Sequence, residues 1–153
     1  MNERLNHAVI NAVEEIFQTI LGVKVKSKEP IEKIIDKDKH ELNVVISIIG
    51  EISGAITLKS SKKLASLIAS KMLGTDVEED SEDMKDAARE FLNIIMGTIK
   101  RHYSSGNPFD ISVPTIIIGG DYLVYTKARK DDNVSLIDFN YNGNFFCVEI
   151  YLK

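Results

Sequence analysis

Residues 86–97, Asp-Ala-Ala-Arg-Glu-Phe-Leu-Asn-Ile-Ile-Met-Gly, are the stretch around which this chain is organised. Successive residues of an α-helix are about 100° apart, so the spacing of the apolar residues predicts the middle of a long amphipathic helix. The apolar arc, expected to face the core, contains Met84, Ala87, Ala88, Phe91, Ile95 and Ile99. The opposite side carries a polar line, called here the 86–97 line, formed by Asp86, Glu90, Asn93 and Gly97.

The composition of the 86–97 line is unusual for a solvated helix surface. Such a surface commonly carries Lys–Glu pairs four residues apart, which stabilise the helix. This one carries two acids, an Asn and a Gly, and Gly in a helix interior costs about 1 kcal/mol relative to Ala. Residues that lower stability where the core does not need them indicate a function. From the geometry alone, a surface helix of chance composition is the alternative interpretation.

The pattern Asp86-x3-Glu90-x2-Asn93, followed after twenty intervening residues by Pro114, resembles the signature of the CheC/CheX/FliY phosphatases. These proteins dephosphorylate the chemotaxis response regulator CheY. The likeness extends to Gly97 and to the order of elements over nearly the whole chain, and it is greatest with CheX. The resemblance implies that Glu90 and Asn93 are catalytic. It also implies that Asp86 and Gly97 contact the partner, and that Pro114 has a structural role near the site.

The substrate implied by the resemblance is a protein that carries an aspartyl phosphate and itself holds Mg²⁺ and a Lys. Catalysis of phosphoryl transfer consists mainly of positioning and charge stabilisation. Because the partner already holds Mg²⁺ and a Lys, what remains for this chain to supply is a fixed attacking water. The neutral carboxamide of Asn93 can enter an anionic site and accept a hydrogen bond from that water. Glu90 is expected to pair with the partner's Lys. We therefore expect no metal or cofactor on this chain, with Mg²⁺ on the response regulator.

Composition bounds the remaining possibilities. The 153 residues are 44% hydrophobic and 27% charged, which indicates a single soluble domain over 1–153. A net charge of −4 gives no basic footprint for nucleic acid. We expect no membrane span and no signal peptide, because no sufficiently long apolar run is present. The lone Cys147 is expected to be buried and unreactive, as in a reducing cytoplasm.

Periodicity and turn residues predict the order of the elements. Helices are expected at 3–21, from Ser60 or Ser61 to about Leu73, and at about 82–104, with Gly22 and Gly74 as stops. Strands are expected at 42–49 and 55–58 as a hairpin, and at 113–118, 122–129, 134–141 and 144–152, with shorter ones at 23–26 and 34–35. This order predicts an α+β (mixed α/β) domain, CheC/CheX-like, with helices packed on a largely antiparallel sheet.

Two features of the last strands sharpen this expectation. The dipeptide Asn142-Gly143 predicts a type I′ hairpin turn, because both of its central residues need positive φ. Within 144–152, Val148, Ile150 and Leu152 alternate with three other residues, which predicts one buried face. The same strand has high β-propensity and one charge. At a sheet edge it would need a covering partner, whereas in mid-sheet it would need none.

The first helix carries a similar line, called here the 7–18 line, offset by 79 residues and formed by His7, Asn11, Glu14 and Gln18. Each of the two helices is followed by strands, so a duplicated unit and a pseudo-repeat in the fold are plausible. Two-site members of the resembled family carry Glu-x2-Asn on both helices, whereas here the order is reversed, Asn11-x2-Glu14. The 7–18 line is either a degenerate second site or a coincidence of two amphipathic helices.

Other chemistry has weak support. The three histidines have no metal ligands at useful spacing, and Gly119-Gly120 lacks the Lys and Ser/Thr of a phosphate loop. The leading hypothesis is a cytoplasmic phosphatase of a phosphorylated CheY-like response regulator. The alternative is a non-catalytic binding module of the same fold for a receiver domain or flagellar switch component. The resemblance also implies a homodimer formed by sheet extension.

Overall fold

The computed structural model describes residues 2–32, 40–104, 106–119 and 133–153. The helical elements are α1 (Glu3–Ile16), the π-helical turn η1 (Phe17–Leu21) that continues it, α2 (Lys62–Leu73) and α3 (Glu82–Tyr103). The strands are β1 (Lys26–Ser27), β2 (Ile31–Glu32), β3 (Leu42–Gly50), β4 (Gly54–Ser60), β5 (Phe109–Ile111), β6 (Thr115–Ile118), β7 (Asn133–Tyr141) and β8 (Asn144–Leu152). The strands expected at 34–35 and 122–129 lie outside the described residues.

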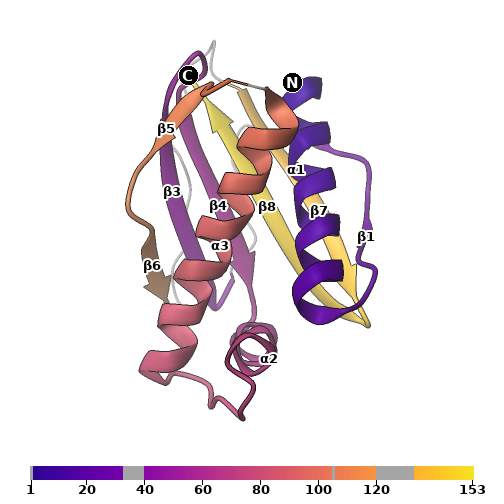
Figure 1. Cartoon of the computed structure of the whole chain (residues 1–153), viewed down its shortest axis with the longest axis vertical. Coiled ribbons are helices and arrows are strands. Elements are labelled where there is room, and N and C mark those ends of the chain that lie inside the picture. The colour runs from indigo at the N-terminus through magenta and orange to yellow at the C-terminus, as the bar shows by residue number, and fades with distance from the viewer. Residues whose placement is uncertain (1, 33–39, 105, 120–132) are drawn as a thin grey trace.

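The strands form one antiparallel sheet in the order β1-β7-β8-β4-β3-β5, with β2 also beside β7 and β6 also beside β3. Helices α1 and α3 lie next to each other across one face of this sheet, and α2 lies at one end of it (Figure 1). The sequence-based prediction of an α+β fold, with helices on an antiparallel sheet, is confirmed.

The sheet has an internal symmetry that supports the pseudo-repeat. Its centre is the pair β8–β4, flanked by β7 on one side and β3 on the other. The outer strands are exchanged between the two halves of the chain: β1 and β2, which follow α1, pair with β7, whereas β5 and β6, which follow α3, pair with β3. Each half therefore completes the sheet of the other.

At each outer edge of the sheet, a β-bulge lies directly before a strand that is preceded by a proline. On β3, β5 pairs with residues 48–50 and β6 with residues 42–45, and the two registers differ by one residue. The registers of β1 and β2 on β7 differ in the same way. Pro114 precedes β6, and Pro30 precedes β2. Because proline has no N–H to donate, it is confined in sheets to edges and bulges, which is where both of these lie.

Local signals account for the helix ends and the hairpins. Ser61 caps α2 by accepting a hydrogen bond from the Leu64 amide, and Gly74 ends that helix in the left-handed conformation. Asn142 and Gly143 have φ values of 47° and 82°, as the predicted hairpin turn requires. Gly54 begins β4 where the backbone carbonyl of Tyr151 leaves no room for a Cβ.

Helix α3 is fixed by its apolar arc, whose predicted members are all buried. Phe91 meets Phe17 edge-on at a centroid distance of 5.5 Å, and Phe17 stacks on Phe146 of β8 at 5.1 Å. Aromatic pairs of this kind contribute about 0.5–1.5 kcal/mol beyond their buried area. Because these three rings join η1, α3 and the sheet, they hold α3 in place and fix which of its sides faces outward.

The structure differs from expectation at one sheet edge. The strand expected at 113–118 begins at Thr115, and a separate strand, β5, precedes it. The bulge explains this division, because the regular register with β3 stops after Ile111 and resumes at Thr115, while the Ser112 amide still donates to the Ser47 carbonyl. The short strand expected at 23–26 lies at Lys26–Ser27.

Strand β8 lies in mid-sheet between β7 and β4 and is buried on both faces. Cys147 is buried, as expected. The alternation of Val148, Ile150 and Leu152 nevertheless did not reveal that Glu149 is buried as well, at 3.0 Å from Lys59 of β4. Two opposite charges can be buried when they pair with each other, which a single strand's pattern does not show. Because β8 pairs on both sides, it does not need a partner chain to cover it.

Candidate functional site

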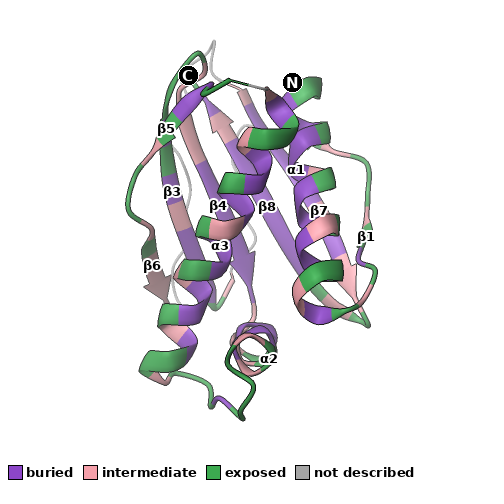
Figure 2. Ribbon diagram, viewed as in Figure 1, coloured by how far each residue is buried: buried purple, intermediate pink, exposed green. Residues whose placement is uncertain are grey.

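The 86–97 line lies on the outer side of α3, directly opposite the buried apolar arc. All four of its residues are exposed, and Figure 2 shows the exposed stripe running along the helix away from the sheet. The expected separation of a core side and a polar side is therefore present. A partner protein can reach the whole line without any rearrangement of the described residues.

Glu90 and Asn93 lie next to each other on this line. A separation of three residues places them less than one turn apart, about 4.5 Å along the helix axis. Within the described part of the chain, neither side chain makes a hydrogen bond or an ion pair. Both are therefore free to bind groups outside the chain, and both come from a regular helix whose other side is locked by Phe91.

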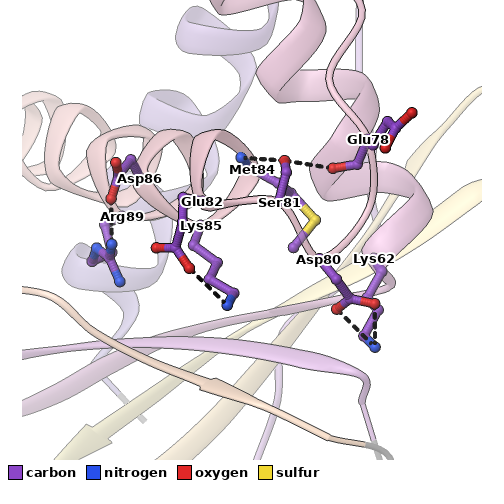
Figure 3. Close-up of polar contacts among 9 residues, drawn as sticks. All are labelled: Lys62, Glu78, Asp80, Ser81, Glu82, Met84, Lys85, Asp86 and Arg89. Atoms are coloured by element: carbon purple, nitrogen blue, oxygen red, sulfur yellow. Dashed lines mark hydrogen bonds and ion pairs between the residues drawn. The ribbon is translucent and has the colours of Figure 1, made fainter.

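Asp86, by contrast, is already engaged. Its carboxylate accepts a hydrogen bond from Arg89 in an ion pair three residues apart (Figure 3). The neighbouring cations are engaged in the same way: Lys85 pairs with Glu82 at 3.2 Å, and Lys62 with Asp80 at 2.9 Å. Sequence reasoning did not anticipate the role of Arg89, although its spacing from Asp86 is that of a common helix pair.

Gly97 leaves an open space on the line. A Cβ built at this position meets nothing within 4 Å. The residue is in the interior of α3, where Gly is less stable than Ala by about 1 kcal/mol. Packing within the described residues therefore does not require Gly here, and the position leaves open space beside the helix.

Pro114 is half-buried at the bulge before β6, on the strand edge against which α3 packs. It lies beside the helix rather than on the 86–97 line. The bulge sets where β6 begins, and β6 supports the flank of α3.

The 7–18 line on α1 is exposed at all four positions as well. It borders an open hollow between α1, the segment after η1 and the end of α3, lined by Asn11, Glu14, Glu15, Gln18, Lys24, Val25 and His102. Gln18 occupies the position that corresponds to Gly97, and it lies in the π-helical turn η1 rather than in regular α-helix. The two lines have the same residue spacing, and both are exposed. They differ in the order of their residues and at the last position, which is an open Gly97 on α3 and Gln18 on α1.

An ion pair joins the two helices near this hollow. Arg101 of α3 donates to Glu15 of α1, with 2.6 Å between Nη2 and Oε2 and 3.4 Å between Nη1 and Oε1. His102 Nε2 lies 3.8 Å from the same carboxylate. The hydrogen bond from Arg101, together with the positive charges of both residues, lowers the pKa of Glu15.

Across the described residues, no group of three or more His, Cys, Asp or Glu side chains is gathered in a way that could hold a metal ion. In the same ranges, every helix is too short or too polar to cross a membrane. The site thus consists of an exposed helix line with one unpaired carboxylate, one free carboxamide and one open position.

Comparisons with known proteins agree on the fold and the family. The family model described as "Chemotaxis phosphatase CheX" matches residues 42–140, a range that includes all of α3 and Pro114. A CheX from Desulfovibrio desulfuricans has a solved structure that is 26% identical, with a TM-score of 0.83 over 97% of this chain and 99% of that one. No curated protein matches the chain significantly.

Two further structures resemble this chain at lower identity. A CheC-like superfamily protein from Shewanella is 21% identical, with a TM-score of 0.86 over 100% of this chain and 99% of that one. A CheX from Borrelia burgdorferi, solved in complex with CheY, BeF₃ and Mg²⁺, is 21% identical, with a TM-score of 0.74 over 96% of each chain. At such identities the likeness establishes the shared fold.

Proposed function

This chain belongs to the CheX family of chemotaxis phosphatases, and on that premise we propose that it hydrolyses the aspartyl phosphate of a CheY-type response regulator. One observation carries the proposal. Glu90 and Asn93 stand together on an exposed helix line, and neither is engaged by the described residues. Asn is a weak helix former, and exposed polar groups with no intrachain partner are expected where a second molecule supplies the partner.

The two side chains have different chemical roles. Asn93 carries no charge, so it can enter the anionic surroundings of a phosphoryl group without Coulomb repulsion. Its carboxamide oxygen accepts a hydrogen bond from the attacking water and orients it in line with the bond to the leaving aspartyl oxygen. Water adds to phosphorus as that bond breaks, and the products are inorganic phosphate and the free aspartate of the regulator.

Glu90 acts through docking. A carboxylate facing the phosphoryl group would be repelled by it, so Glu90 must meet a cation, which the resemblance assigns to a Lys of the receiver. Asp86 lies one turn earlier, and its pair with Arg89 places both charges at the edge of the proposed interface with the receiver. Gly97 lies one turn after Asn93 and admits the receiver backbone.

The partner we propose is a phosphorylated receiver domain that brings its own Mg²⁺. The Borrelia burgdorferi CheX, which shares this fold, was solved with CheY, BeF₃ and Mg²⁺. This chain then needs no metal or cofactor of its own, because the ion neutralises phosphoryl charge from the partner's side. We expect the reaction to take place in the cytoplasm, where such regulators act.

The direct test is phosphate release from a phosphorylated receiver domain, measured with and without this protein in the presence of Mg²⁺. We expect dephosphorylation to be faster in its presence and to saturate with protein concentration. Binding to the beryllofluoride-loaded receiver without any acceleration would instead support the alternative, a non-catalytic module. An inactive Asn93→Ala control excludes a contaminating phosphatase.

We further propose that the chain forms a homodimer, as the resemblance implies. Because β8 is paired on both sides, a joined sheet would have to use an outer strand. Light scattering at micromolar concentration tests this: twice the mass of 17.1 kDa supports the dimer, and a mass near that of one chain rejects it.

A further inference from the structure

The 86–97 line continues one turn further than its motif, to Arg101. Arg101 follows Gly97 by four residues and lies about 20° from Glu90 around the axis of α3. At about 1.5 Å per residue, the two are roughly 16 Å apart along the helix. The Arg101 side chain is 62% exposed. The exposed side of α3 therefore has a free carboxylate toward one end, a neutral middle and a guanidinium at the other end.

The guanidinium of Arg101 is held in place rather than left to sample many rotamers. Glu15 of α1 accepts hydrogen bonds from both of its terminal nitrogens. An Arg has five N–H donors in a fixed plane, so the contact with one carboxylate leaves donors available on its open side. Fixing the head group in advance lowers the entropy that a later contact would cost.

Two intrachain roles could explain a cation at this position. Cations in the last turn of a helix interact favourably with the helix dipole, and the ion pair with Glu15 joins α1 to α3. Lys100 also lies in that turn and serves the dipole equally well, and His102 follows Arg101 directly. What distinguishes Arg101 from them is its place on the same exposed line as Glu90, combined with a fixed head group.

We propose that Arg101 is a docking residue that binds an acidic side chain on the phosphorylated receiver. This inference rests on the proposed function, because it assumes the same partner. Glu90 and Arg101 form two contacts of opposite sign about 16 Å apart. A partner with a cation facing one and an anion facing the other can lie along α3 in only one direction. Arg101 thus selects receivers and orients them, while Asn93 performs its role between the two contacts and closer to Glu90, about 4.5 Å from it along the helix axis.

The test measures the affinity for beryllofluoride-loaded receiver with Mg²⁺, by titration at low and high salt, for matched variants. Arg101→Gln removes the charge but keeps a long polar side chain. Glu15→Gln breaks the same ion pair but leaves the Arg101 charge available. Lys26→Gln, on the exposed edge strand β1, controls for the loss of any surface cation.

We expect Arg101→Gln to weaken binding about three- to tenfold, with a smaller salt dependence, because rim charges act mainly through electrostatic attraction. Arg101→Lys should recover part of the loss. Lys26→Gln should stay close to wild type, and Glu15→Gln should weaken binding much less than Arg101→Gln, because it loses the fixed head group but keeps the charge of Arg101. Arg101→Gln and Glu15→Gln both lose the same exposed intrachain pair, so each should lower the thermal midpoint only slightly.

Equal weakening of binding by Arg101→Gln and Glu15→Gln would overturn the inference, because it would mean that the ion pair acts only as a link between helices. Unchanged affinity of Arg101→Gln would overturn it as well. If the wild type binds the receiver without hydrolysing its phosphate, the proposed phosphatase activity is refuted. The comparison of receiver affinity between Arg101→Gln and Glu15→Gln still decides the docking role. A wild-type chain that does not bind the receiver at all refutes both.

Discussion

Helices α1 and α3 lie next to each other on one face of the sheet, and they differ in the residues on their outer sides. Both carry four exposed residues at spacings of four, three and four. On α3 the order is acid then amide, the last position is an open Gly97, and the helix stays regular. On α1 the order is reversed, Gln18 fills the last position, and the helix widens into the turn η1.

Under the proposed function, spacing and exposure are not enough to make a site. The α1 line has the same periodicity and is equally exposed, but it lacks the residue order and the open position that we propose for receiver docking. We therefore expect the residues at four positions on each helix to decide which helix is active. The following experiments exchange or remove those residues, each with its counterpart on the other helix as control.

The largest effect is expected at Asn93. Asn93→Ala removes the group that orients the water, and losing one well-placed polar group typically lowers the rate about 10²–10³-fold. Affinity for the beryllofluoride-loaded receiver should be retained, which single-turnover kinetics and a titration together can establish. Asn93→Asp should also be inactive, because it brings a negative charge toward the phosphoryl group. Glu14→Ala, its counterpart on α1, should be nearly normal; a comparable loss there would contradict the comparison.

Glu90 should affect binding more than turnover. Glu90→Ala removes the partner of a cation, and we expect affinity to fall about tenfold, equivalent to about 1.4 kcal/mol. Glu90→Lys should weaken the complex further by repulsion. A fluorescence titration against the loaded receiver measures both. Asn11→Lys is the control at the matching position, and unchanged affinity for both Glu90 variants would refute the docking role.

Two substitutions at Gly97 distinguish its effect on protein stability from its effect on receiver binding. Gly97→Ala should stabilise the protein by about 1 kcal/mol, because the position is helical and has room for a Cβ. Urea denaturation reports this as a higher midpoint with an unchanged slope. Gly97→Gln, which copies the residue found on α1, should keep the fold but reduce receiver affinity by blocking close approach. If Gly97→Gln binds normally, the open position has no role in docking.

The smallest effect is expected on α1. Changing Asn11 and Glu14 together to Ala should leave turnover within about twofold, since substitutions at exposed positions without partners usually have small effects. The measurement is phosphate release under the conditions used for Asn93→Ala. A loss similar to that of Asn93→Ala would show that both helices carry working sites, and the comparison drawn above would then fail.

Much of this architecture was readable from the sequence because its signals are local. Ser61 and Gly74 fix the ends of α2, and Asn142-Gly143 fixes a hairpin, through the conformations of only a few residues. The sides of α3 follow from helical periodicity in the same way. The sequence alone therefore determined which residues form the 86–97 line and that this line faces away from the core.

Only the tertiary structure decided which distant segments meet. The exchange of outer strands between the two halves, the bulge that separates β5 from β6, and the position of β8 in mid-sheet depend on pairing between remote residues. The burial of Glu149 against Lys59 and the bridge from Arg101 to Glu15 likewise join residues far apart in the chain. Neither segment shows such a contact in its own hydrophobic pattern. The contact forms only when the fold brings the two distant residues or strands together.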